Sequence, residues 1–221
     1  MWGPDRTGVS VRGNLIEGVR ALTPSMSPSH KFKASGDWLE RLDGKRRRSV
    51  IPPETIVDHL AITRTDEAAD LGAGVGYFAF PMAARAKNVV CVDMQDKMLE
   101  VLSQRIRERK VRNMLPLKGN IHELPMADAS LDHLFGAFVF HEVDDPRVFL
   151  YECSRVLRSD GTLTIVDFQK HAPIDFGPPE EVRMTPEHVV RSCSTQFVER
   201  SRFEDPVYYQ ISFSKKGCSV R

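Results

Sequence analysis

The segment Glu67-Ala-Ala-Asp-Leu-Gly-Ala-Gly-Val-Gly76 decides the fold of this chain. Its first half is a short apolar strand, and its second half is a glycine-rich turn. About twenty residues further on, a second apolar strand, Val89-Val-Cys-Val-Asp93, ends in a carboxylate. This arrangement suits a nucleoside, because glycines let the backbone approach a ligand and the later acid accepts hydrogen bonds from both ribose hydroxyls.

The spacing of the glycines separates two kinds of nucleoside ligand. A dinucleotide fingerprint needs G-x-G-x-x-G, because its last glycine packs a helix against the strand below a pyrophosphate. Here the glycines are Gly72, Gly74 and Gly76, and the sixth position holds Tyr77. Asp70 precedes the first glycine, where a carboxylate would repel a pyrophosphate and attract an ammonium group. The pattern predicts a cationic nucleoside without phosphates, which fits S-adenosylmethionine.

Length and charge limit the class of protein. The 221 residues suffice for one well-buried α/β domain but not for two large ones. The net charge of +1 gives no reason to expect nucleic acid or an anionic membrane as a partner. The sequence has no apolar run near the roughly 20 residues of a membrane span.

The cysteines stand far apart, without a C-x-x-C pair. They are Cys91, Cys153, Cys193 and Cys218. Such spacing favours reduced, mostly buried thiols, and it does not suit a structural zinc site. We therefore expect a cytoplasmic protein without a metal centre.

The first sixty residues differ in composition from the rest. Residues 1–29 are rich in proline and glycine, and we interpret them as a flexible leader or, in part, a lid that orders on binding. Residues 37–49 are predicted to be helical and end in Lys45-Arg-Arg-Arg48. That run favours a solvated helix end, with an anion site as the alternative. Another helix is expected after Pro52-Pro53.

From residue 67 onward, predicted strands and helices alternate, as in a parallel sheet covered on both faces. We expect strands at 67–71, 88–92, 114–118, 132–138 and 162–168, and helices at 76–86, 95–110 and 145–157. A helix after Pro186 and strands near 196–200 and 206–214 should follow. Arg158-Ser-Asp-Gly161 is predicted as a turn, and alternation in Val207–Phe213 indicates a half-exposed strand.

Five motifs follow one another through residues 50–214. They are Asp70-Leu-Gly-Ala-Gly-Val-Gly76, Val92-Asp93, Lys118-Gly-Asn-Ile-His-Glu-Leu-Pro125 with Ala129-Ser-Leu-Asp132, Phe138-Val-Phe-His-Glu-Val143, and Leu157-Arg-Ser-Asp-Gly-Thr-Leu163. In this order they resemble the motifs of class I S-adenosylmethionine-dependent methyltransferases. The chain is most similar to small methyltransferases related to the ubiquinone and menaquinone biosynthesis type. His30-Lys-Phe32, Pro52-Pro53 and Gly177-Pro-Pro-Glu180 resemble markers of one subgroup.

The resemblance implies an α/β fold with a Rossmann-like sheet. Seven strands are expected, six parallel and the last antiparallel, with helices on both faces. The implied domains are a flexible leader (1–29), an N-terminal helical lid (30–62), the methyltransferase domain (63–214) and a C-terminal tail (215–221). The implied cofactor is S-adenosylmethionine.

Matching positions imply roles around the first two motifs. Asp70 would help to hold the methionine ammonium, partly through water. Gly72 and Gly74 would let the backbone touch the ligand, and Gly76 would ease entry into the next helix. Asp93 would bind both ribose hydroxyls. In the purely structural alternative, the glycines are only steric and Asp93 is a helix cap.

Four further residues are implied in the same site. Met94 and Ile121 would cover the two faces of adenine, and the carbonyl of Phe138 would contact the ammonium. Asn120 stands where the family usually has Asp, but an amide oxygen can still accept a hydrogen bond from the adenine amino group. Gly119-Asn120 also suits an ordinary turn, which is the alternative.

His141 is the candidate catalytic residue. A general base is needed only when the methyl acceptor arrives protonated, and an imidazole at the end of the fourth strand can serve near neutral pH. Alternatively, His141 and Glu142 pack beneath a loop or cap the next helix. Tyr77 and His30 are further candidates for the acceptor pocket.

The sequence disfavours several acceptors. Phe140-His-Glu142 stands where enzymes that methylate amide and adenine nitrogens have an Asn/Asp-Pro-Pro-aromatic motif, and no Pro-Cys pair supplies a nucleophile for RNA cytosine. We therefore expect methyl transfer to a small molecule by in-line displacement. The alternatives are a non-catalytic or regulatory S-adenosylmethionine-binding protein and a nicotinamide oxidoreductase, which Tyr77 disfavours. The acceptor atom and the oligomeric state stay open.

Overall fold

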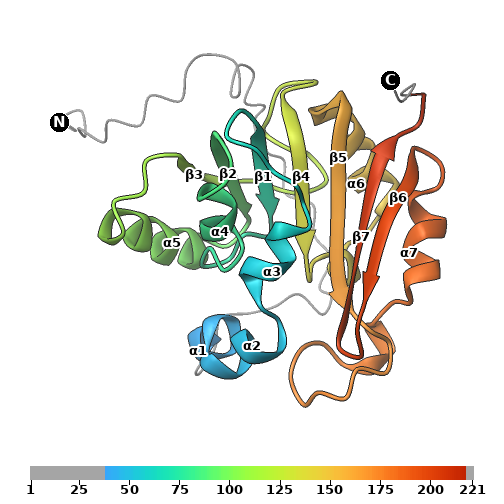
Figure 1. Cartoon of the computed structure of the whole chain (residues 1–221), viewed down its shortest axis with the longest axis horizontal. Helices are drawn as coiled ribbons and strands as arrows, with labels where there is room; N and C mark the ends of the chain where they lie inside the picture. The colour runs from blue at the N-terminus through green and yellow to red at the C-terminus, as the bar shows by residue number, and fades with distance from the viewer. Residues whose placement is uncertain (1–37, 218–221) are drawn as a thin grey trace.

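The computed structural model describes residues 38–217, so the predictions for the leader and for His30 lie outside the described residues. One sheet has the strand order β3-β2-β1-β4-β5-β7-β6 (Figure 1). Its strands are β1 (Glu67–Leu71), β2 (Asn88–Asp93), β3 (Met114–Lys118), β4 (Leu131–Ala137), β5 (Leu157–Phe168), β6 (Phe197–Glu204) and β7 (Tyr208–Lys215).

The helices lie before, between and after these strands. They are α1 (Trp38–Asp43), α2 (Lys45–Val50), α3 (Pro53–Asp58), α4 (Ala79–Ala83), α5 (Asp96–Glu108), α6 (Pro146–Val156) and α7 (Pro186–Cys193), with short 3-10 turns at Phe140–Glu142 and Glu180–Val182. Within residues 38–217, none of the helices has the length and apolar content needed to cross a membrane.

The predicted direction of the strands is confirmed. All pairings among β1 to β5 are parallel, whereas β7 is antiparallel to both β5 and β6. Six strands therefore run in one direction and the last strand in the other. The carboxyl ends of the parallel strands meet at one edge, beside α1, α2 and the loop of residues 169–185 (Figure 1).

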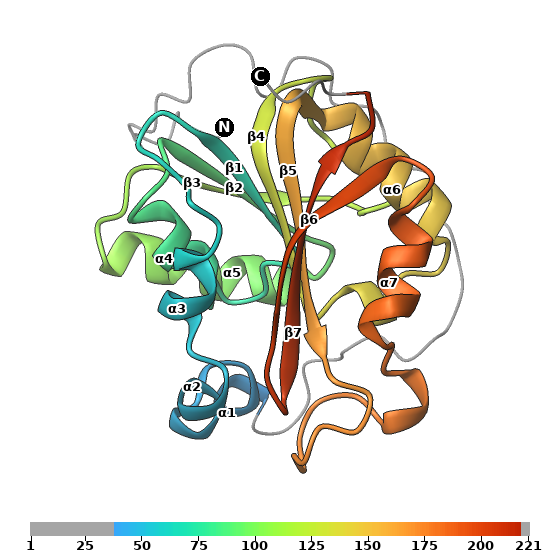
Figure 2. The ribbon, with the colours of Figure 1, turned by 45° about the vertical axis from the view of Figure 1, so that its right-hand side comes forward.

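Helices cover both faces of the sheet, as expected. Residues such as Ala68, Val89 and Cys91 pack with α3, α4 and α5. Their neighbours along the strands, such as Ala69 and Val90, pack with α6 and α7. Figure 2 shows these two sets of helices on opposite sides of the sheet. The strands of a doubly covered parallel sheet are apolar on both faces, which explains their continuous apolar sequences.

Two helix predictions had the wrong extent. The helix expected at 37–49 is divided at Gly44, which is extended (φ −80°, ψ 164°) and whose added Cβ would lie 2.3 Å from the carbonyl oxygen of Glu40. The helix expected at 76–86 is reduced to α4, because a turn with positive φ at Gly74 and Gly76 precedes it.

The turn predicted at Arg158–Gly161 is wrong, because these residues belong to β5. Leu157 pairs with Leu131 and Thr162 with His133, so residues 158–161 form a bulge opposite Asp132. The side chain of Arg158 forms an ion pair with Asp132, which anchors the bulge to β4. Gly161 does not adopt the positive φ that a turn would have required.

The half-exposed strand predicted at Val207–Phe213 is also wrong, because β7 is a central strand with both faces covered. Its apolar residues pack towards α7. On the opposite face, Gln210 donates a hydrogen bond to the carbonyl of Ile56 (3.2 Å), and Ser212 shares one with Thr164 (2.9 Å). The polar side chains of the alternating pattern are therefore buried and hydrogen-bonded rather than solvated.

Candidate functional site

A cavity of about 900 Å³ lies at the carboxyl ends of the parallel strands. Its wall is formed by residues from α1 and α2, the glycine turn, the segments after β2, β3 and β4, and the loop after β5. The strand order reverses between β1 and β4, and open α/β sheets bind ligands at such a switch point. The cavity is therefore the candidate ligand site of the described residues.

The glycine turn forms the floor of the cavity. The N–H groups of Gly72 and Ala73 donate to the carbonyl of Val92 (2.8 and 3.0 Å), which fixes the turn against the end of β2. Gly74 lines the cavity at φ 52°, and an added Cβ would meet only the carbonyl oxygen of Gly72, at 3.9 Å. The backbone is thus open to a ligand at Gly74.

Asp93 lies at the end of β2 and lines the same cavity. Its Oδ2 accepts a hydrogen bond from Gly74 N–H and its Oδ1 accepts one from Gln95 N–H, both at 2.9 Å. Burial raises the pKa of Asp93, although these hydrogen bonds oppose the rise. Each carboxylate oxygen retains a second lone pair for a ligand hydroxyl.

Two of the predicted residues do not line the cavity. Asp70 is buried behind the turn, and its Oδ2 has no hydrogen-bond partner. Burial, together with the charge of Asp93, raises the pKa of Asp70 well above its usual value. Gly76, at φ 87°, packs against α5, since an added Cβ would lie 2.7 Å from Leu102 Cδ1.

The predicted adenine residues lie together along the cavity wall. Met94, Asn120 and Ile121 all line it, and Met94 is 52% exposed. The Oδ1 of Asn120 already accepts a hydrogen bond from the backbone N–H of His122 (3.0 Å) and lies 3.1 Å from its Nδ1. The oxygen that would accept from adenine, Asn120 Oδ1, is therefore the same one that closes the turn predicted as the alternative for this segment.

His141 forms a buried pair with Asp167, a residue that the sequence analysis missed. The His141 Nδ1 lies 2.8 Å from Asp167 Oδ1, and the backbone N–H of His141 donates to Asp167 Oδ2 (3.2 Å). Burial disfavours the imidazolium, but the charge and hydrogen bond of Asp167, with a contribution from Glu142, outweigh it and raise the pKa of His141. His141 lines the cavity, and its Nε2 lies 3.8 Å from Glu142 Oε1, which is beyond hydrogen-bond distance, so this ring nitrogen can still accept a bond from a ligand.

Aromatic rings line the cavity near His141. The centroid of Phe138, which lines the cavity at φ 58°, lies 4.4 Å from that of Phe168, and Phe168 lies 6.2 Å from Phe176. Tyr77 also lines the cavity, and its hydroxyl donates to the carbonyl of Ile51 (2.7 Å). This part of the cavity suits a flat or apolar ligand group.

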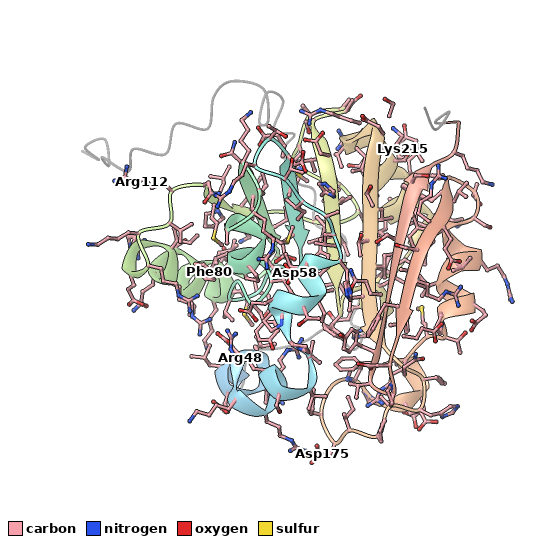
Figure 3. The ribbon with its side chains drawn as sticks, in the orientation of Figure 1. Arg48, Asp58, Phe80, Arg112, Asp175 and Lys215 are labelled. Carbon is pink, nitrogen blue, oxygen red and sulfur yellow. The ribbon has the colours of Figure 1, made fainter. Side chains whose placement is uncertain are left out.

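The run Lys45-Arg-Arg-Arg48 is not simply a solvated helix end, which corrects the favoured prediction. Arg47 lines the cavity, with its guanidinium carbon 4.9 Å from the ring centroid of Phe138. Arg46 forms an ion pair with Asp175 of the loop after β5, so α2 and this loop meet over the cavity. Figure 3 places Asp175 on that loop, at the end of the molecule where Arg48 and α2 lie.

Comparisons with known proteins agree with this geometry. Residues 69–165 match the family model described as "Methyltransferase domain". The uncharacterized methyltransferase YcgJ of Bacillus subtilis is 33% identical over 48% of this chain and 41% of its own length. The demethylmenaquinone methyltransferase of Thermotoga maritima is 30% identical over 57% of this chain and 51% of its own. The chain thus spans about half the length of these relatives.

The solved structures show the same fold. The S-adenosylmethionine-dependent methyltransferase from Aquifex aeolicus superposes with a TM-score of 0.75 and 23% identity, over 82% of this chain and 98% of its own. The match over residues 69–165 and the shared fold make the chain similar to the class I S-adenosylmethionine-dependent methyltransferases. The cofactor of this class is S-adenosylmethionine.

The residues of the cavity fit that cofactor. The backbone is open at Gly74, a carboxylate with free lone pairs lies beside it, and the buried Nε of Arg47 lacks a hydrogen-bond partner. Within residues 38–217, no cluster of His, Cys, Asp or Glu side chains suits a metal ion.

Proposed function

We propose that this chain moves a methyl group from S-adenosylmethionine to a small-molecule acceptor by in-line displacement. The observation that carries the proposal is the His141–Asp167 pair, because its histidine lines the same cavity as the glycine turn and Asp93. A protein that only binds the cofactor has no need of a histidine held by a buried carboxylate beside it. A catalyst that removes a proton needs such a histidine as its general base.

In this proposal the glycine turn and the segment after β2 hold the nucleoside. The backbone at Gly72 and Gly74 approaches the ribose and amino-acid portions of the cofactor. Asp93 accepts hydrogen bonds from the ribose hydroxyls while it keeps those from Gly74 and Gln95. Gly76 supports the turn from behind.

The remaining contacts surround adenine and the ammonium group. Met94 and Ile121 pack on the faces of adenine, and Asn120 accepts from its amino group through the oxygen that also accepts from His122. The carbonyl of Phe138 faces the ammonium. Asp70, which does not line the cavity, acts on the ammonium through an intervening water and through its charge.

The bound cofactor supplies a methyl group already activated on a sulfonium, so the protein must orient the acceptor and take up its proton. Asp167 accepts the Nδ1–H of His141 and thereby fixes the tautomer in which Nε2 can accept that proton. Phe138, Phe168 and Phe176 exclude water from the acceptor. The acceptors that need these groups carry a hydroxyl or an acidic carbon.

The enclosure of the cavity supports a small acceptor rather than nucleic acid. Residues from α1 and α2 line it from one side and residues 175–179 from the other. We propose that the segment 30–62 acts as a lid on the domain of residues 63–214. The described cysteines, Cys91, Cys153 and Cys193, are buried free thiols, which supports a cytoplasmic location.

Two measurements test the proposed function. Titration calorimetry with S-adenosylhomocysteine measures cofactor binding. Mass spectrometry of a metabolite extract, incubated with a labelled methyl donor, detects transfer to any acceptor. We expect tight binding and a labelled product that disappears in His141→Ala, while S-adenosylhomocysteine binding is retained.

A non-catalytic cofactor-binding protein is the second candidate, because Asn120 stands where the resemblance implies an Asp. Tight binding without a labelled product from the extract, or from a panel of phenols, quinols and amines, would favour this candidate.

A further inference from the structure

Arg47 differs from its neighbours in the arginine run. Arg46 forms an ion pair with Asp175, and Arg48 forms one with Asp43 (2.5 Å). Within residues 38–217 no carboxylate pairs with Arg47, and its Nε is buried without a hydrogen-bond partner. Of the three arginines in the run, Arg47 is therefore the one that lines the cavity and has no carboxylate partner within residues 38–217.

The packing around Arg47 offsets only part of the cost of burying this charge. Its guanidinium carbon lies 4.9 Å from the centroid of Phe138 and 5.2 Å from that of Tyr77, so two aromatic faces contact the cation. Burial lowers the pKa of Arg47 to about 10. The side chain therefore stays charged near neutral pH, and a buried charge without a partner is unfavourable.

The acidic groups near Arg47 are engaged with other partners. Asp43 also accepts from Arg105 (2.5 Å) in addition to Arg48, and Asp175 pairs with Arg46. Asp167 is held by His141. The hydroxyl of Tyr77 donates to a carbonyl, so it does not neutralise the cation. Among residues 38–217 no acid is left to pair with Arg47, and a molecule in the cavity that Arg47 lines can supply the partner.

We propose that Arg47 is the carboxylate-binding residue of this cavity. The inference rests on the proposed function, because that reaction decides which molecules enter. A guanidinium presents a planar fork that matches a carboxylate with two parallel hydrogen bonds. A phosphate is disfavoured, because the buried acids Asp70 and Asp93 lie by the glycine turn.

Two molecules of the proposed reaction can supply the carboxylate. One is the cofactor, through its amino-acid end. The other is an acceptor that is itself a carboxylic acid and whose flat part lies on the wall of Phe138 and Phe168. The chemistry at Arg47 is the same in both cases, and the experiment separates the two sources.

The test compares two nucleosides on the full chain. Titration calorimetry measures the binding of S-adenosylhomocysteine and of methylthioadenosine, which lacks the amino acid, to the wild type, Arg47→Gln and Arg47→Lys. The matched control is Lys45→Gln, since Lys45 lies on the same helix but is exposed and is not among the residues that line the cavity. Thermal unfolding shows that each variant is folded.

If the cofactor supplies the carboxylate, Arg47→Gln weakens the binding of S-adenosylhomocysteine roughly tenfold to a hundredfold and leaves the binding of methylthioadenosine unchanged. Arg47→Lys then recovers part of the lost affinity. If the acceptor supplies it, both nucleosides bind normally and carboxylic acids disappear from the labelled products of the extract. Unchanged nucleoside binding with an unchanged set of labelled products overturns the inference. A wild type that does not bind S-adenosylhomocysteine refutes the proposed function instead.

Discussion

Replacing Asp93 by alanine is predicted to remove cofactor binding without unfolding the chain. Its carboxylate accepts the N–H groups of Gly74 and Gln95, both at 2.9 Å, and in the proposed complex it also accepts two ribose hydroxyls. A hydrogen bond to a charged group contributes about 1.5–3 kcal/mol. The two ribose bonds together therefore contribute about 3–6 kcal/mol, and their loss weakens binding roughly a hundredfold to ten-thousandfold.

The same substitution should have a smaller effect on folding. Alanine leaves the N–H groups of Gly74 and Gln95 without their acceptor, but both residues line the cavity, where water can replace the carboxylate. The variant also no longer buries a charge whose pKa is raised by desolvation. We expect the free energy of unfolding to fall by about 1–3 kcal/mol, which most domains tolerate.

The assay is titration calorimetry with S-adenosylhomocysteine, combined with thermal unfolding. Asp96→Ala is the matched control, because Asp96 is an acid near the same end of β2 that is 67% exposed and pairs with Lys118. The control should bind like the wild type. A folded Asp93→Ala variant with wild-type affinity would refute the ribose contact.

Three further outcomes are expected. Asp167→Asn should lower kcat roughly a hundredfold to ten-thousandfold and move the acidic limb of the pH–rate profile to lower pH. His141 acts as a base when it is neutral, and its pKa falls when the Asp167 carboxylate that raises it is removed. An acidic limb that does not move would contradict the assignment of His141 as the general base. Gly76→Ala should reduce the free energy of unfolding by about 2–5 kcal/mol in denaturant titrations, because φ is 87° and the added Cβ meets Leu102 and Phe80; no change would exclude this strain. S-adenosylhomocysteine at a hundred times its Kd should raise the free energy of unfolding by about 2.7 kcal/mol in thermal scans, whereas stabilisation by NAD alone would favour an oxidoreductase.

The sheet was predictable because its strands carry strong local signals. The bounds of β1 and β3 match the prediction, since each strand is a short apolar run with a clear end. β7 was misjudged, because alternation shows which side chains share a face but not what covers that face. Gln210 and Ser212 are buried by partners far away in the sequence, Ile56 and Thr164.

The site was predictable where its residues lie within motifs. His141 and Asp167 are 26 positions apart, and they meet because β4 and β5 are neighbours with parallel carboxyl ends. Asp167 follows an apolar run near the end of a predicted strand, so a signal for it existed. For Arg47 the only signal in the sequence concerned the whole run Lys45–Arg48, in which an anion site was the alternative to a solvated helix end. Three consecutive arginines look alike in sequence, and only the direction of each side chain from a short helix distinguishes the one that lines the cavity.

The two buried acids bear on the charge of the ligand that the cavity can accept. The sequence placed both Asp70 and Asp93 at the ligand, but only Asp93 lines the cavity. Burial and the charge of Asp93 raise the pKa of Asp70, which means that ionising both acids without a nearby cation is unfavourable. A positively charged ligand relieves this cost, and a phosphate would increase it. We therefore expect Asp70 to favour a cationic ligand through its charge, although it does not line the cavity.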